Sequence, residues 1–496
     1  MPAQTPERPG TLRGPGCTDP EVRSPEHGTA GREWKSGGMA TTVAVLGGGI
    51  SGLAAAWELC RSDSGCEVTL LEGTDRVGGK LRLAEVGGVR IDVGAESVLA
   101  RRPEALTLFD ELGLADRVTH PGPAGASIVS RGKRWPMPRG TLMGVPSDPE
   151  SVRGLLTSDE VDRLAREVLG EVVEGDVSVG DLVDRRLGNA VTDRLVEPLL
   201  AGVYAGHARE ISAEQAVPVL AAAARDGRPL LDVARTAAAA AANGSAAGRP
   251  VFASLVGGLG TLPEELERRL AESGVDLRTS TVVRELGRDG DGWVVSTGPT
   301  TDVTQERFDA VVVATPAAPA SRLLRTVAPA AASALAGIEY ASMAIVTLAL
   351  DGPPPAVLDG SGFLVPPTEP LTIKASTFSS VKWPWLAAAH PERTFLRASV
   401  GRHREESSLQ RSDAELVEVA LADLRRVLGE LPQPSAAHVQ RWGGGLPQYA
   451  VGHRARLAPT RDLPPGLALG GAAYDGVGIP ACIASGRAAA RAVLTP

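Results

Sequence analysis

The chain has 496 residues, too many for one ordinary hydrophobic core, so we expect two or three domains. Hydrophobic residues make up 43% and charged residues 22% of the sequence, a balance typical of a globular protein in water. The formal net charge of −8, with no block of Lys or Arg, argues against a nucleic-acid-binding surface.

Residues 1–38 are rich in Pro, Gly, Arg, Glu and Thr and show no apolar period. This composition favours disorder, and the segment lacks the apolar stretch of a secretory signal. Met39 stands directly before the first predicted strand. We therefore expect either a disordered N-terminal extension or a start of translation at Met39, and we expect removal of residues 1–38 to leave stability and activity unchanged.

Residues 43–80 predict a dinucleotide-binding βαβ unit. An apolar strand over 43–46 leads through a glycine-rich turn into a helix, and a second apolar strand over 68–71 ends at Glu72. The pattern G-x-G-x-x-G lets the backbone approach a pyrophosphate at a helix N-terminus, and an acid about twenty residues further on suits an adenosine ribose. The glycines of this pattern are Gly47, Gly49 and Gly52. Three glycines alone would indicate only a tight turn, but strand, helix and acid in register favour the cofactor site.

The segment after Glu72 favours a flavin over a nicotinamide. A pair of glycines precedes Lys80, and residues 94–97 close a predicted hairpin over 81–93. The extension, E-x3-R-x-G-G-K, resembles the flavin-containing amine oxidase superfamily, in which the double glycine passes beside FAD and the basic residue reaches toward it. The resemblance implies FAD as the cofactor.

Helical patterns dominate residues 103–248. A short helix over 103–112 follows Arg101 and Arg102, a pair that is either an exposed loop or an anion contact. A hairpin surrounds Gly132, and a capping box at Thr157 starts the main helical stretch. Further helices are expected over 179–187, 193–200 and 213–224, with a glycine-flanked loop over 202–206 and a helix end or flexible insertion over 236–248.

Strand patterns return after residue 250. A strand over 251–256 leads into a helix over 263–273, with Pro263 at its first position. Near the end of the chain an apolar strand passes through glycines into a helix over 481–494, whose positive end is suited to stabilise a reduced flavin. The other expected elements are strands over 277–280, 282–286, 293–297, 308–314, 342–350 and 394–400, and a helix over 412–429.

The cysteines and histidines indicate no special site. The four cysteines form no C-x-x-C pair, and the seven histidines show no metal-ligand spacing. We therefore expect reduced thiols in a cytoplasmic protein and no bound metal. No stretch approaches about eighteen consecutive apolar residues, so no transmembrane helix is predicted, and a peripheral membrane contact stays open.

Four segments carry a closer resemblance: LGGGISGLAAAWEL, FASLVGGLGTLPEEL, KWP and GAAYDGVGIPACIASGRAA. Together with LPQY after Trp442, they make residues 43–494 resemble the oxygen-dependent, FAD-containing protoporphyrinogen and coproporphyrinogen oxidases, in particular the Gram-positive, actinobacterial type. The implied fold is α/β with α+β elements: a Rossmann-type FAD-binding domain of the flavin amine oxidase superfamily, a mixed-sheet substrate domain and a helical domain. The expected boundaries are 39–100, 250–320 and 438–496 for the FAD domain, 101–135 and 321–437 for the substrate domain, and 136–249 for the helical domain.

The resemblance also implies the site residues. No catalytic side chain is assigned, because conjugation in the product drives the reaction and no general base is required. Arg101 and Arg102 are offered as partners of substrate propionates, since guanidinium pairs with carboxylate. The FAD-binding residues carried over are Gly47, Gly48, Gly49, Ile50, Ser51, Gly52, Glu72, Gly73, Lys80, Gly94, Ala95, Glu96, Ser97, Val283, Trp442, Val477, Gly478 and Ile479.

The implied reaction is the six-electron oxidation of coproporphyrinogen III to coproporphyrin III in haem synthesis, with O2 as acceptor and H2O2 as product. Protoporphyrinogen IX is the alternative substrate. We favour coproporphyrinogen III because aromatic residues make up only 3% of the chain and the helical region mixes Asp, Glu and Arg with its apolar residues. A flavin amine oxidase and a non-catalytic flavin or tetrapyrrole carrier stay open, and a downstream ferrochelatase is a candidate partner.

Overall fold

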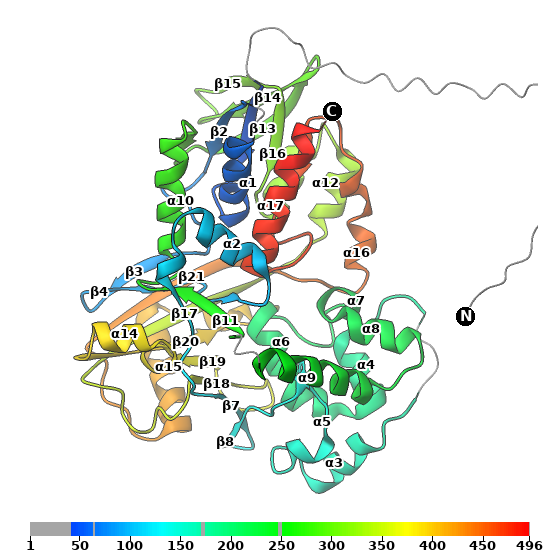
Figure 1. Cartoon of the computed structure of the whole chain (residues 1–496), viewed down its shortest axis with the longest axis vertical. Coiled ribbons are helices and arrows are strands. Elements are labelled where there is room, and N and C mark those ends of the chain that lie inside the picture. The colour runs from blue at the N-terminus through cyan, green and yellow to red at the C-terminus, as the bar shows by residue number, and fades with distance from the viewer. Residues whose placement is uncertain (1–40, 63–64, 170–173, 247–249, 496) are drawn as a thin grey trace, which may run out of the picture. The chain divides into compact units, whose positions relative to one another are not determined.

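The computed structural model describes residues 41–62, 65–169, 174–246 and 250–495 (Figure 1). The predictions about residues 1–38 lie outside these described residues. All described residues belong to one compact unit, and its division into three domains stays a prediction. Within the described ranges, no helix is both long and apolar enough to cross a membrane.

A five-stranded parallel sheet carries the N-terminal strand at its centre. Every residue from Val43 to Leu46 is buried, because helices cover both faces of the sheet. Val45 pairs with Leu70 on one side and with Val312 on the other. The strands, in order across the sheet, are β12 (Asp276–Arg278), β2 (Glu67–Leu71), β1 (Thr42–Leu46), β16 (Ala310–Val313) and β22 (Leu467–Leu469). The apolar strand predicted over 43–46 is confirmed.

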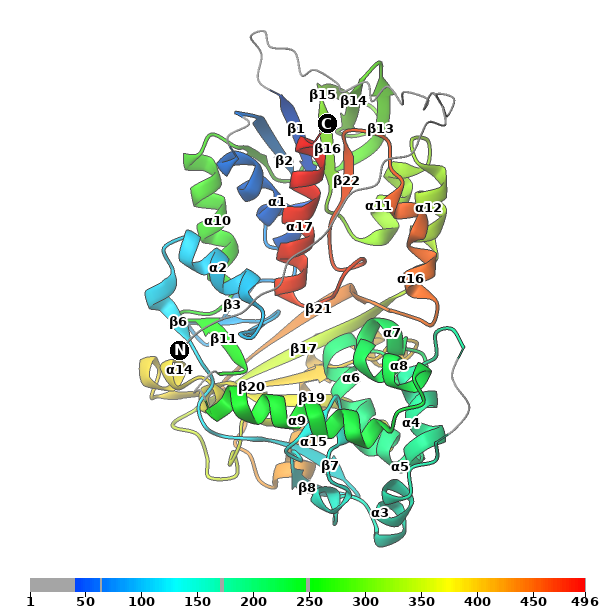
Figure 2. The same cartoon turned by 45° about the vertical axis from the view of Figure 1, so that its right-hand side comes forward.

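The two faces of this sheet have separate cores. On one face Val43 and Val45 pack with α1, α10, α17 and α2, and α1 and α17 lie side by side in both views (Figures 1 and 2). On the other face Ala44 and Leu46 pack with α11 and α12. These helices are α1 (Ile50–Arg61), α2 (Pro103–Glu111), α10 (Thr261–Glu272), α11 (Ala317–Leu324), α12 (Pro329–Ala336) and α17 (Ile479–Leu494).

A seven-stranded mixed sheet forms the second layer. Its pair β18–β7 is parallel and its other pairs are antiparallel. Leu416 and Leu424 of α15 (Asp413–Leu428) are packed in the apolar core of this sheet. Its strands, in order, are β21 (Ala436–Pro447), β17 (Tyr340–Asp351), β20 (Arg393–Val400), β19 (Ile373–Phe378), β18 (Gly362–Leu364), β7 (Ala126–Ser130) and β8 (Lys133–Pro136). The sheet connects the parallel-sheet region to a group of helices (Figure 2).

The helical group contains α3 to α9 around one apolar core. The capping box at Thr157 is confirmed. The expected helix over 193–200 instead consists of a π-helical turn and then α6, which continues to Tyr204 into the predicted loop. Pro218 splits the helix expected over 213–224, because proline starts a new helix but cannot continue one. The bounds are α3 (Ser158–Ala165), α4 (Val179–Leu187), α5 (Asn189–Val191), α6 (Glu197–Tyr204), α7 (Ala213–Ala216), α8 (Pro218–Arg225) and α9 (Leu230–Ala246).

Two helix starts and one strand also differ from the prediction. Helix α10 begins at Thr261, so Pro263 is its third residue and not its first. Helix α17 begins at Ile479, two residues before the predicted start, with Gly478 as its N-cap. A strand that the sequence analysis missed, β15 (Thr304–Phe308), joins β13 (Val283–Asp289) and β14 (Gly292–Thr297) in an antiparallel sheet. The predicted hairpin before residue 94 is confirmed as β3 (Leu83–Val86) and β4 (Val89–Asp92).

Candidate functional site

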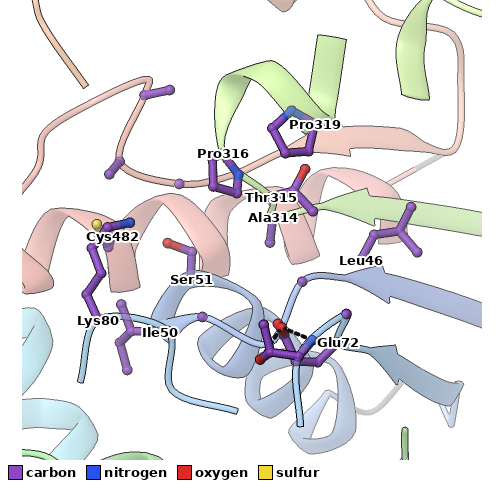
Figure 3. Close-up of a pocket in the computed structure, with 18 of the residues that line it drawn as sticks. Leu46, Ile50, Ser51, Glu72, Lys80, Ala314, Thr315, Pro316, Pro319 and Cys482 are labelled. Carbon is purple, nitrogen blue, oxygen red and sulfur yellow. Dashed lines mark hydrogen bonds between the residues drawn. The ribbon is translucent and has the colours of Figure 1, made fainter. Parts of the chain in front are cut away.

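A cavity of about 550 Å³ lies at the carboxyl ends of the parallel strands (Figure 3). Leu46, Leu71 and Ala314, at or just after the ends of β1, β2 and β16, line it together with the first residues of α1 and α17. This edge of a parallel sheet is where open α/β folds bind ligands. In Figure 3, Lys80 and Cys482 lie on one side of the cavity and Leu46 on the other.

The glycine-rich turn shapes one wall of this cavity. Gly47 has a φ of +106°, which side chains other than glycine rarely adopt. A Cβ built on Gly52 would lie 1.8 Å from the main-chain oxygen of Gly47, so this position must be glycine for the turn to pack against the helix. A Cβ on Gly49 would meet no atom within 4 Å. Open space therefore lies beside Gly49, at the N-terminus of α1.

Two helix N-termini meet at the cavity without a side-chain cap. Gly49 is the N-cap of α1 and Gly478 is the N-cap of α17, and neither can accept a hydrogen bond through a side chain. Ile50 and Ser51 of α1, and Ile479 and Cys482 of α17, line the cavity. The unpaired N–H groups and the positive dipole ends of both helices are therefore available to an anionic or carbonyl-bearing ligand.

Glu72 directly follows β2 and holds the glycine-rich turn in place. Its Oε2 accepts a 2.7 Å hydrogen bond from the N–H of Gly48, and its Oε1 accepts from the N–H and hydroxyl of Thr74 at 2.8 and 2.7 Å. The carboxylate lines the cavity and keeps free lone pairs that suit a hydroxyl-bearing ligand.

Two buried side chains, Tyr449 and His453, hold the loop before α17 in place. Tyr449 donates through its hydroxyl to the oxygen of Ala472 at 2.5 Å, and His453 Nε2 donates to the oxygen of Ala473 at 2.9 Å. The two rings stack with centroids 4.4 Å apart. Ala472 and Ala473 line the cavity, so these two side chains set the position of its wall.

The side chains of Lys80 and Cys482 lie together on one side of the cavity, and both line it (Figure 3). Burial among the surrounding residues lowers the pKa of the Lys80 ammonium. Burial raises the pKa of the Cys482 thiol to about 11, so the thiol is neutral at physiological pH. An anionic ligand group at this end would favour the charged form of Lys80.

A second cavity of about 250 Å³ adjoins the first, since Ala95 lines both. It is lined by residues 94–97 and by residues of β17, β19 and β20 of the mixed sheet. Glu96 binds two cations there: its Oε1 lies 2.6 Å from Lys382 Nζ and its Oε2 lies 2.6 Å from an Arg397 guanidinium nitrogen. Arg397 also donates to the main-chain oxygen of Gly94. Burial opposes ionisation of Glu96, but the charges of Lys382 and Arg397 prevail and hold its pKa at about 2.

The structure brings most of the predicted FAD-binding residues together. Those that line the large cavity are Gly47, Gly49, Ile50, Ser51, Glu72, Gly73, Lys80, Ala95, Val283, Val477 and Ile479. Gly94, Glu96 and Ser97 line the second cavity. Gly48, Gly52, Trp442 and Gly478 line neither cavity. Trp442 donates to the main-chain oxygen of Val93, the residue before Gly94. Their roles toward a cofactor stay predictions.

Arg101 and Arg102 line neither cavity. Both side chains are exposed, and Arg102 forms an ion pair of 2.6 Å with Glu104. Arg397, the cationic residue that lines the second cavity, was not among the residues predicted from the sequence. The available signal was a charged residue in the centre of the apolar strand β20, where burial requires a partner.

Comparisons with known proteins agree with this geometry. A sequence profile described as flavin containing amine oxidoreductase matches residues 50–494. Coproporphyrinogen III oxidase of Mycobacterium tuberculosis is 38% identical over 453 residues, which cover 90% of this chain and 95% of that protein. Protoporphyrinogen oxidase of Macaca fascicularis is 33% identical, over 92% of this chain and 99% of that protein. A crystal structure from Exiguobacterium, assigned as a protoporphyrinogen oxidase, matches with a TM-score of 0.79 and 31% identity over 92% of this chain and 99% of that chain.

Proposed function

The chain belongs to the family of flavin-containing amine oxidoreductases, and we propose that it oxidises coproporphyrinogen III to coproporphyrin III in haem synthesis, with FAD as cofactor and O2 as electron acceptor. The observation that carries the proposal is the identity of 38%, across nearly the whole length of both chains, to a coproporphyrinogen III oxidase. Six electrons and six hydrogens leave the macrocycle in three steps. Three molecules of O2 take them up as three molecules of H2O2.

The residues of the large cavity fit FAD. The uncapped start of α1, with open space beside Gly49, suits the pyrophosphate, and the carboxylate of Glu72 suits the adenosine ribose. The hydroxyl of Thr315 also lines the cavity and is buried without a hydrogen-bond partner among the described residues, so it has a free donor for a ligand. The start of α17 would hold the ring system, and Val283 the adenine.

Bound FAD supplies the electron-pair acceptor for each step. The protein's own groups prepare the site for it. The positive end of α17 favours the negative charge that a reduced ring carries. Residues 94–97 separate the two cavities and would place the macrocycle against the ring, since Ala95 faces both. No side chain is needed as a general base, because the aromatic product drives the reaction.

The test is a comparison of both porphyrinogens with the purified protein, recorded by porphyrin fluorescence and O2 consumption. We expect a higher kcat/KM for coproporphyrinogen III, and a higher value for protoporphyrinogen IX would assign the second substrate instead. Mixing without O2 separates an enzyme from a carrier, because an enzyme's flavin absorbance is bleached by the substrate. Residues 443–453 contain no cysteine for a covalent bond, so acid precipitation is expected to release all flavin as FAD.

A further inference from the structure

The second cavity carries an unbalanced positive charge. Two of the residues that line it are charged, Glu96 and Arg397, and Lys382 is bonded to the same carboxylate. Glu96 is ionised, as its pKa of about 2 indicates. Two cations therefore share one anion in a region where Arg397 is only 8% exposed. The sum of these three side-chain charges is +1.

An unbalanced charge away from water is costly unless another anion meets it. A further carboxyl that interacts electrostatically with Arg397 is that of Asp92, which is buried and accepts hydrogen bonds from the N–H groups of Leu259 and Gly260. Burial raises the pKa of Asp92 to about 7, so its ionised form is incomplete near neutral pH. Asp92 thus balances the cluster only in part. Among the described residues lining the second cavity, Glu96 is the one carboxylate.

Arg397 also has donors to spare. Its terminal nitrogens bond Glu96 and the oxygen of Gly94, but a guanidinium carries five N–H groups, and its Nε has no hydrogen-bond partner among the described residues. The other polar groups lining the cavity are the hydroxyls of Ser97, Thr377 and Ser399. A cationic cavity lined with hydroxyl groups is suited to bind a carboxylate.

We propose that the second cavity binds a carboxylate of the substrate and that Arg397, with Lys382 beside it, selects porphyrinogens by their number of propionates. This inference rests on the proposed function. Coproporphyrinogen III carries four propionates, and protoporphyrinogen IX replaces two of them by vinyl groups. A cavity with net positive charge, next to the cavity proposed for the flavin, favours the former. Arg101 and Arg102 lack this placement, since both are exposed and line neither cavity.

The main test is Arg397→Gln, which removes the charge but keeps a polar side chain. The matched control is Arg393→Gln, the same change four residues earlier in β20 and outside both cavities. We expect KM for coproporphyrinogen III to rise about tenfold or more in Arg397→Gln, as loss of a desolvated charge partner does elsewhere, with kcat little changed. The ratio of kcat/KM between coproporphyrinogen III and protoporphyrinogen IX should fall. An unchanged ratio overturns the inference.

A second variant separates selection from a purely structural role. Glu96→Gln removes the anion and leaves the two cations, so coproporphyrin III, titrated by fluorescence quenching, should bind more tightly and with a steeper dependence on salt. If the three residues served only to hold the loop, the same variant would bind coproporphyrin III no more tightly than the parent, and that result overturns the inference.

Should either variant lose its flavin, Lys382→Gln provides the test. We expect this variant to bind coproporphyrin III more weakly, and unchanged binding would contradict the inference. Failure of the parent protein to oxidise either porphyrinogen would refute the proposed function itself.

Discussion

Gly486 of α17 lies directly against Ser51 of α1: a Cβ built on Gly486 would stand 2.0 Å from the main-chain oxygen of Ser51. This contact allows the two helices to approach closely, so that both of their N-termini reach one cavity. Each uncapped N-terminus alone would be a weak anion site. Because both N-termini lie at one cavity, they could bind the two ends of a long ligand, which suits a dinucleotide.

We therefore expect Gly486→Ala to weaken flavin binding. The added methyl has no room, and overpacking of this kind costs about 1–3 kcal/mol of unfolding free energy. The measurement is the ratio of flavin to protein after purification, with thermal unfolding beside it. Ala488→Ser, an exposed change on the same helix, is the control and should leave both unchanged. Full flavin content in Gly486→Ala would contradict the close-packing argument.

Gly49 and Gly52 give a pair of variants with different expected outcomes. Gly49 has φ −69° and ψ 174°, which any residue adopts, and its Cβ would meet no atom, so Gly49→Val should keep the fold. The added side chain occupies the space proposed for the pyrophosphate, so flavin should be lost. Gly52→Val should lose both the fold and the flavin, since its Cβ would clash with the glycine-rich turn. Circular dichroism and flavin absorbance distinguish the two cases, and normal flavin content in Gly49→Val would show that the site is elsewhere.

The sequence predicted the βαβ unit because its signals are local. The turn, the helix start and Glu72 all fall within a short stretch, and each residue type has one physical reason to be there. The charged cluster of the second cavity is different. Glu96 stands 286 residues from Lys382 and 301 from Arg397. Only the packing of β20 and of the short helix Ser379–Lys382 against residues 94–97 brings the three together.

The errors in the helical group have a local cause. Periodicity of apolar residues does not distinguish an α-helix from a helix interrupted by a π turn, as at residues 192–196, because the buried face stays almost the same. Proline is the more informative signal. Pro218 marks a break that the pattern of apolar residues concealed, whereas Pro263 lies in the first turn of α10 and breaks nothing.

Asp92 is expected to make stability depend on pH. Its pKa is about 7 in the folded protein and about 4 in an unfolded chain, so between these values the folded state keeps a proton that the unfolded state has released. The contribution of Asp92 to stability is therefore complete below about pH 4 and is lost as the pH rises through about 7. Unfolding by urea at several pH values should show this decline.

Asp92→Asn should flatten the decline, because the amide does not titrate. The variant is also less stable at all pH values by about 1–3 kcal/mol, since the amide nitrogen cannot accept the N–H of Leu259 or Gly260. The exposed Asp110→Asn in α2 is the control and should keep the parent's slope. An Asp92→Asn variant with the parent's slope would place the titration on another group.

The last prediction concerns the wall behind the cavity. Tyr449→Phe keeps the ring that stacks on His453 and removes the hydroxyl that donates to Ala472. The loss of one hydrogen bond costs about 0.5–1.5 kcal/mol, and because Ala472 lines the cavity, we expect that cost to reduce flavin affinity about threefold to tenfold. Isothermal titration of the apoprotein with FAD measures the change.

Tyr204→Phe is the matched control, since the Tyr204 ring packs on the Tyr449 ring with centroids 5.6 Å apart but Tyr204 does not line the cavity. Equal losses in both variants would mean that the ring cluster acts on overall stability, whereas a loss confined to Tyr449→Phe ties the hydroxyl to the position of the flavin wall.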